Sequence, residues 1–400
     1  MKLPALLASL LSFASVYAQQ PCQSAGELDA IPGKHIDAAH CEWPAQRATW
    51  LDNMKTPARK AVANTVLTQI ETLEKESRKN FGLTGGVLKS SFSADNGCLY
   101  QRKQIGATYA LQLGCYRYIC IRNKQEVSGE YSTVLRATVN PRFSALFSNF
   151  PFEGKFSQMV FDEGACTKGL DLFEYVGFQD PKLIQVVNGE GGYYQDIPEE
   201  KEKKLPSGNG NYITRTWYIT KAGKSPFLPV SRREFLEGLL AYYEKEKSVA
   251  SLYKVSIDEE FARLSAKGYD ERWYNNKLGP YKDYEKAVAT KKANVQKLLQ
   301  DQPADWLAKP AVIDNMKSWL TDASKPDYAG LYTFVAFAAS ESGSNVNRIY
   351  RYNPNYFVDE SSGKPQLIRV TFRYVKVPFD QRMATNFTDM FDRTAWEKLL

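Results

Sequence analysis

Both histidines of the chain lie in one short segment, HIDAAHC, which covers residues 35–41 and ends in a cysteine. Imidazole nitrogens and thiolates are common zinc ligands and common members of nucleophilic catalytic groups. His35 and His40 are five positions apart, which matches neither the i, i+4 spacing of a zinc-binding helix nor a paired Cys-x-x-Cys site. We therefore expect a structural or solvent-exposed role for this segment, with no metal.

Acidic residues gather in FDEGACTKGLDLFEYV, residues 161–176, and provide a second source of chemistry. A glycoside hydrolase needs only two carboxyl groups held about 5 to 9 Å apart in a cleft. The candidates are Asp162, Glu163, Asp171 and Glu174. The competing interpretation is that they flank turns and strand ends, because proximity in sequence does not create the environment that tunes a carboxyl group.

Aromatic residues make up 13% of the chain, and two clusters mix rings with amides. Rings that stand beside asparagines suit a sugar, whose flat apolar face stacks while amides bind its hydroxyls. The same rings also suit ordinary, partly buried packing. The candidate ligand-binding residues are Trp273, Tyr274, Asn275 and Tyr281 in the first cluster, and Tyr350, Tyr352, Asn353 and Tyr356 in the second.

Several familiar catalytic signatures do not occur in the sequence. We find no Gly-x-Ser-x-Gly elbow, no Gly-x-x-x-x-Gly-Lys-Ser/Thr phosphate loop and no Gly-x-Gly-x-x-Gly fingerprint. Two histidines also leave few routes to a Ser-His-Asp triad, a Cys-His pair or a three-histidine zinc centre. We expect no cofactor, and enzymatic activity stays open with the balance against it.

The first 18 residues have the order of a secretory signal peptide. Lys2 precedes an apolar run up to Val16, and small residues lead to a cleavage site after Ala18. No later stretch reaches the roughly 18 consecutive apolar residues of a membrane helix. The sequence therefore predicts a periplasmic or secreted protein without a transmembrane segment in its mature chain.

Export bears directly on the cysteines, because an even number of them in an oxidising compartment favours disulfides. Cys115 and Cys120 lie five apart in a predicted strand, on opposite faces and about 16 Å from each other, so we exclude that bridge. A bridge from Cys22 to Cys41 is the economical choice, and it would remove Cys41 as a ligand or nucleophile. We expect all six to be paired: Cys22, Cys41, Cys98, Cys115, Cys120 and Cys166.

The formal charge of +7 is unevenly distributed. Residues 201–400 hold 32 bases and 24 acids, whereas residues 1–200 hold 20 and 21. A moderate excess of this kind is usually solvated surface and only weakly favours anionic partners such as acidic glycans or lipid headgroups. Nucleic acid would be an unexpected partner for an exported protein.

The sequence pattern of the first half of the chain predicts a helix followed by strands. A helical pattern covers residues 43–79, with Thr56 and Pro57 as a start signal. Residues 82–220 are strand-rich, and EYSTVLRATV at 130–139 alternates with period two. We expect an antiparallel meander with an exposed loop at 197–211.

The second half begins with a helical insert at about 231–320. Ser231 and Glu234 form a capping box, and Ser256 and Glu259 form a second one that opens a short helix. A third helix is predicted at 280–301. Strands return beyond residue 330, before a terminal helix, and the two β-rich parts could belong to one sheet.

This order of elements predicts an α+β fold built from antiparallel β-rich regions, an N-terminal helical segment and the helical insert. The expected parts are the signal peptide (1–18), an irregular lead segment (19–42), a helix plus antiparallel sheet (43–228), and the helical insert followed by strands and a terminal helix (229–400).

Several segments resemble exported proteins of Bacteroidota that have no assigned function. They are LDAIPGKHIDAAHCEWPAQR, LTGGVLKSSF, GEYSTVLRATVNP, SPFLPVSRREFLE, YNPNYF and QLIRVTF. The resemblance implies export from a Gram-negative-type cell and supplies no catalytic residues.

The sequence thus predicts an exported, non-enzymatic protein that binds a ligand or glycan, or associates with another envelope component. The alternative is a carboxylate-dependent hydrolase acting on polysaccharide. Two carboxylates facing each other in a cleft would favour the hydrolase, and a ligand surface without them would favour the binding protein. A broad exposed apolar patch would instead indicate a structural envelope protein.

Overall fold

The computed structural model describes residues 25–40, 51, 54, 56–94, 106–131, 133–143, 175–190, 194–198, 212–268, 271–278, 284–321, 331–343, 345–359 and 362–400. The predicted signal peptide, four of the cysteines and the four candidate carboxylates lie outside these residues.

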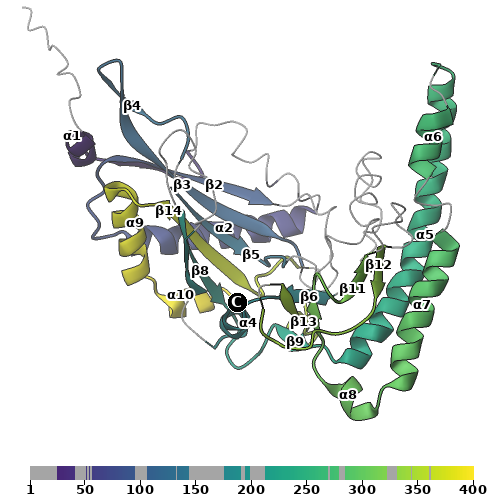
Figure 1. The fold of residues 1–400 in the computed structure, drawn as a ribbon. Coiled ribbons are helices and arrows are strands. Elements are labelled where there is room, and N and C mark those ends of the chain that lie inside the picture. The colour runs from purple at the N-terminus through teal and green to yellow at the C-terminus, as the bar shows by residue number, and fades with distance from the viewer. Residues whose placement is uncertain are drawn as a thin grey trace, which may run out of the picture.

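A large sheet forms the centre of the molecule (Figure 1). Its strands follow the order β1-β2-β3-β5-β14-β8-β7, and β4 extends β3 as a hairpin. All neighbours are antiparallel except β1 and β2. The strands are β1 (Lys34–Ile36), β2 (Gly86–Ala94), β3 (Tyr109–Ile121), β4 (Lys124–Val127), β5 (Thr133–Val139), β7 (Tyr194–Pro198), β8 (Tyr212–Ile219) and β14 (Ile368–Val375).

Strand β14 lies between β5 and β8, although the helical insert separates it from both along the sequence. The two β-rich parts of the chain therefore contribute to one sheet, as the sequence allowed.

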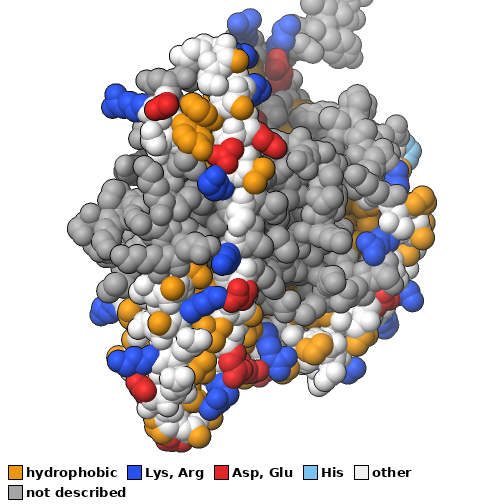
Figure 2. Space-filling model, turned by 90° about the vertical axis from the view of Figure 1, so that its right-hand side faces the viewer, with side chains coloured by type: hydrophobic (Ala, Val, Ile, Leu, Met, Phe, Trp, Pro, Cys, Tyr) orange, Lys and Arg blue, Asp and Glu red, His pale blue; other side chains and the backbone are white. Residues whose placement is uncertain are grey.

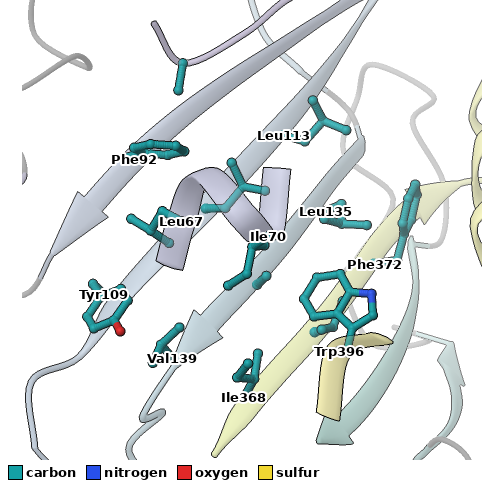
Figure 3. Close-up of a cluster of buried hydrophobic side chains, with 14 of the residues drawn as sticks. Leu67, Ile70, Phe92, Tyr109, Leu113, Leu135, Val139, Ile368, Phe372 and Trp396 are labelled. Carbon is teal, nitrogen blue, oxygen red and sulfur yellow. The ribbon is translucent and has the colours of Figure 1, made fainter. Parts of the chain in front are cut away.

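Helices α2 (Pro57–Ser77), α9 (Pro378–Asp389) and α10 (Arg393–Glu397) cover one face of this sheet. Side chains of alternating strand residues meet Leu67 and Ile70 of α2 and Trp396 of α10 in the main core (Figure 3). Helix α2 begins at Pro57, as its start signal predicts, and residues 41–50 lie outside the description. The main core thus occupies one side of the sheet only.

A second, smaller sheet has the order β10-β13-β6, with β9 paired to β13. It consists of β6 (Tyr175–Phe178), β9 (Phe227–Pro229), β10 (Val312–Asp314) and β13 (Val346–Tyr352). Helix α4 (Pro181–Val187) packs with it, and Asp180 caps that helix. A further strand pair, β11 (Trp319–Thr321) and β12 (Leu331–Phe334), and the short helix α1 (Ala25–Ala30) complete the β-rich part.

The helical insert forms an arm beside the second sheet (Figure 1). It contains α5 (Arg232–Ser265), α6 (Glu271–Leu278), α7 (Tyr284–Asp301) and α8 (Ala304–Ala308). The capping box of Ser231 and Glu234 is confirmed, with both reciprocal hydrogen bonds present. The predicted helix start at Ser256 is wrong, because α5 continues through it and buries the next residue, Ile257.

The architecture confirms an α+β fold. Within the described residues, no helix combines the length and the apolar character needed to cross a bilayer.

The prediction that all six cysteines are paired is wrong for Cys115, which is a buried free thiol on β3. Its side chain belongs to the main core, where a reduced cysteine packs as a small apolar residue. The excluded bridge between Cys115 and Cys120 is indeed absent. Cys120 is not a free thiol.

Candidate functional site: a basic sheet face

The five central strands of the large sheet have an unusual charge composition. Strands β2, β3, β5, β8 and β14 contain six basic residues and no acidic residue. Two of the six lie on the side of the main core. Arg117 is 3.8 Å from Asp380 of α9, and Arg215 donates a hydrogen bond of 2.6 Å to Thr388.

The other four bases point to the opposite side of the sheet. Successive residues of a strand alternate between faces, and residues directly opposite on neighbouring strands share a face. One cross-strand row runs Lys89, Gly114, Val134, Arg373 and Thr214. The next row contains Gln112, Arg136 and Thr371, and a third contains Thr138, Arg369 and Tyr218. We call the surface formed by Lys89, Arg136, Arg369 and Arg373 the basic face.

Three arginines form a compact triangle on this face. Arg136 on β5 is directly opposite Thr371 on β14, and Arg369 and Arg373 lie two residues to either side of Thr371. Such diagonal neighbours are about 7 to 8 Å apart. Arg136 is exposed and the other two are half-buried. No carboxylate among the described residues forms an ion pair with Arg136 or Arg369.

Hydroxyl and amide groups fill the spaces between the cations. Strand register places them on the same face as the arginines. They are Ser91, Ser93, Gln112, Thr138, Thr214, Thr216 and Thr371. Ser91, Thr138 and Thr216 are buried. Ser93, Gln112, Thr214 and Thr371 are partly exposed, and their side chains can donate and accept hydrogen bonds.

Two tyrosine–cation pairs stand on this face. The guanidinium carbon of Arg373 is 3.8 Å from the ring centroid of Tyr212. The Lys89 ammonium is 4.8 Å from the ring of Tyr116, and Tyr131 meets that ring edge-on at 5.8 Å. Aromatic faces attract cations, so the two rings help to position these basic groups.

Further structure covers both ends of the basic face. At one end, Leu28 of α1 packs with Val87 and Tyr116. At the other end, Tyr218 belongs to the cluster formed with α4 and the second sheet. Burial raises the pKa of Tyr218, and the nearby Arg369 guanidinium, which hydrogen-bonds to the phenol, opposes that shift. Other elements of the fold thus cover both ends of the basic face.

This arrangement of basic groups is suited to binding an anion. Guanidinium groups recognise carboxylates, sulfates and phosphates in a planar, two-pronged geometry. The five strands supply no carboxylate or histidine to act as a general base beside them.

The histidine segment occupies a different place. His35 lies on β1, the edge strand of the large sheet, and its Nε2 is 3.1 Å from the Ser90 hydroxyl. His40 is exposed and hydrogen-bonded to Asp37. Burial, with smaller contributions from Arg78 and Lys75, lowers the pKa of His35 to about 4. The described residues hold no cluster of three or more potential metal ligands.

The first aromatic cluster lies on α6 of the arm. The Tyr274 hydroxyl donates a 2.5 Å hydrogen bond to Asp258, and its ring packs on Phe261 at 4.4 Å. Asn275 is exposed. The Trp273 side chain and all of Tyr281 lie outside the described residues. A ligand-binding role for this cluster stays a prediction.

The second aromatic cluster lies on β13 and the turn after it. Tyr352 and Tyr356 are 2% and 0% exposed and belong to the core of the second sheet, so their rings pack inside the protein. Tyr350 is half-buried against Phe178, and Asn353 donates its side-chain amide to the Ser225 carbonyl. The two clusters lie on different elements, and neither is part of the basic face.

Sequence analysis did not identify the basic face. Its signal was present in the alternation of Arg369 and Arg373 with apolar residues along β14, in Arg136 on β5, and in the lack of acids on five strands. Only the strand register brings these residues together.

Comparisons of the chain with protein-family models, with curated proteins and with solved structures find no match.

Proposed function

We propose that this chain is an exported, non-enzymatic protein that binds an acidic glycan on the basic face. The observation that carries the proposal is the placement of four cations on one side of five strands that contain no acidic residue. Arg136 and Arg369 lie on adjacent strands, where like charges repel each other, and a bound anion would relieve that repulsion.

The covered ends of the basic face favour a polymer strand over a membrane surface as the ligand. A bilayer is flat, whereas α1 and the second sheet cover the two ends of the basic face. A glycan chain is narrow enough to lie between them. Its hydroxyls would meet the partly exposed Gln112 and Thr371 side chains, and its acidic groups would meet Arg136 and Arg369.

The charge of the helical arm differs from that of the basic face. Lys, Arg, Asp and Glu side chains alternate along the arm (Figure 2). Ion pairs such as Lys254–Asp258 on α5 partly balance these charges. We therefore assign the arm no part in anion binding.

Export completes the proposal and is supported by the signal-peptide pattern of residues 1–18 and by the resemblance to exported proteins of Bacteroidota. N-terminal sequencing of the protein recovered from a periplasmic or extracellular fraction should begin at Gln19. Recovery of the chain from the cytosol with Met1 intact would contradict export.

A glycan array probed with the full mature chain tests the ligand class. We expect signals on uronic-acid or sulfated glycans and none on their neutral counterparts. Release of shortened sugars during incubation would contradict the non-enzymatic part of the proposal. Retention on anionic vesicles or nucleic acid, with no array signal, would contradict the choice of a glycan.

A further inference from the structure

Residues 34–40, which we call the strap, run along the outer edge of β2 at one end of the large sheet. We infer that protonation of His35 in mildly acidic solution releases the strap while the rest of the sheet stays folded. This conformational device goes beyond the proposed function and does not depend on the glycan.

The strap has a short backbone attachment to the sheet. Its strand β1 pairs with β2 over three residues, Lys34–Ile36, and lies at one end of the strand order. The pairing is parallel, which is slightly less stable per residue than antiparallel pairing. By contrast, all nine residues of β2 pair with β3 on its other side. The strap therefore relies on its side chains for much of its attachment.

His35 is the strap residue at the centre of this attachment. It is directly opposite Leu88 of the main core, and its Nε2 is 3.1 Å from the hydroxyl of the buried Ser90. A charged imidazole would lose part of its hydration at this half-buried position. Burial accordingly lowers the pKa of His35, with smaller contributions from Arg78 and Lys75 of α2. The attached strap thus favours the neutral ring.

Two buried carboxylates of α2 lie in the same region and are bound by other groups. Glu71 accepts a 3.0 Å hydrogen bond from the backbone N–H of Ala38 in the strap and is 3.8 Å from the Lys75 ammonium. Glu74 accepts two hydrogen bonds from Arg78. Neither carboxylate needs a protonated imidazole as its partner.

The remaining titratable groups around His35 do not reverse its preference for the neutral form. Asp37 favours the protonated ring, but its contribution is smaller than those that lower the pKa of His35, and it is hydrogen-bonded to His40. Burial and the carboxylate of Asp380 on α9 raise the pKa of the Cys115 thiol on β3, so that group stays uncharged.

Release returns the His35 ring to water, where its pKa is near the ordinary value of 6.5. Below that pH the released state binds more protons than the attached state. The equilibrium therefore shifts toward release as the pH falls from about 6.5 toward 4. Release uncovers the outer N–H and C=O groups of β2, to which another strand can pair.

The residues before the strap have an attachment of their own. Asp29 accepts hydrogen bonds of 2.5 and 3.0 Å from Arg382 of α9, and the N–H of Gly85 donates to the carbonyl of Ile31. His35 takes no part in these contacts. We therefore expect the opening to be confined to the strap, as a local unfolding event.

Hydrogen exchange of the full mature chain, read by mass spectrometry at pH 7.5 and pH 4.5 and corrected for intrinsic exchange rates, tests this inference. Opening of the strap should rise by on the order of tenfold or more at the lower pH, while α2 and β3 keep their protection. His35→Asn should remove the rise. His40→Asn changes the exposed histidine of the same strap and should retain the rise.

Three outcomes would overturn the inference. They are unchanged protection of the strap at pH 4.5, a loss of protection that reaches β3 at the same time, and an equal rise in wild type and His35→Asn. His35→Gln repeats the comparison if the asparagine variant does not fold at pH 7.5. Failure of the strap leaves the acidic-glycan proposal standing, because the strap contributes no residue to the basic face.

Discussion

The guanidinium of Arg373 lies over the ring of Tyr212, with 3.8 Å between the guanidinium carbon and the ring centroid. Both residues project from the side of the large sheet that faces away from α2. A contact of this kind orients a cation and leaves its charge intact. It therefore fixes the orientation of one cation of the basic face.

Replacing Gly114 with alanine should disturb the packing of the Tyr116 and Tyr131 rings. The new Cβ would crowd the buried Tyr116 ring, and overpacking of this kind costs about 1 to 3 kcal/mol of unfolding free energy. Urea denaturation measures the loss. Gly129→Ala is the matched control, because a Cβ there meets nothing within 4 Å. Equal stability of the two variants would show that the rings do not rest on Gly114.

The buried ion pair of α2 should matter far more than an exposed pair on the same helix. Arg78 donates two hydrogen bonds to Glu74, at 2.5 and 2.8 Å, and both side chains are buried. Glu74→Gln leaves a buried guanidinium without its carboxylate, so we expect a loss of about 3 to 5 kcal/mol. Glu76→Gln removes an exposed partner of Lys79 and should cost no more than about 1 kcal/mol. If urea denaturation shows a similar loss of unfolding free energy for the two variants, the buried pair does not have the stabilising role proposed for it.

His35 should make stability depend on pH. Its pKa is about 4 in the folded protein, below the ordinary value of 6.5, so the unfolded chain binds more protons between these values. Stability should therefore be full above pH 6.5 and fall as the pH drops toward 4, by on the order of 2 kcal/mol after allowance for partial exposure. The variant His35→Asn should lose this part of the dependence. Parallel stability curves of the two proteins from pH 7.5 to pH 4 would refute the prediction.

Cys115 should react with a thiol reagent only after unfolding. Burial raises the pKa of its thiol, and the carboxylates of Asp380 and Glu74 act in the same direction. Ellman's reagent should detect this thiol in denatured protein and miss it in native protein. Cys115→Ala should lack the signal. A Cys115-dependent signal from native protein, or none after denaturation without reductant, would be inconsistent with a buried free thiol.

Helix-start rules correctly predicted the features that depend only on residues close together in the sequence. The start of α2 at Pro57 and the capping box at Ser231 depend on neighbouring residues, and the structure confirms both. The helix start predicted at Ser256 is wrong for a physical reason. A serine caps a helix only if the preceding backbone leaves the helical conformation, and α5 runs straight through this position.

The candidate site depended on information that local patterns do not contain. Alternation along β5 and β14 places Arg136, Arg369 and Arg373 on strand faces, but pairing across the helical insert decides that they are neighbours. Tyr352 and Tyr356 were candidates because aromatic side chains often bind sugars. The sequence could not show that both rings are buried in the core. An even cysteine count likewise could not reveal that Cys115 points into the core.

The most direct test of the account is the affinity of the mature chain for a polyuronate, measured by titration calorimetry at low and high salt. Arg136→Gln removes the exposed cation of the basic face, and Arg263→Gln removes an exposed charge from the arm as the control. We predict that Arg136→Gln weakens binding by about tenfold or more, the effect of losing one charged hydrogen-bonding contact. Arg263→Gln should match the wild type, and salt should weaken every complex. Equal affinity of all three proteins, or no binding to the polyuronate at low salt, would contradict the assignment of the basic face as the binding site.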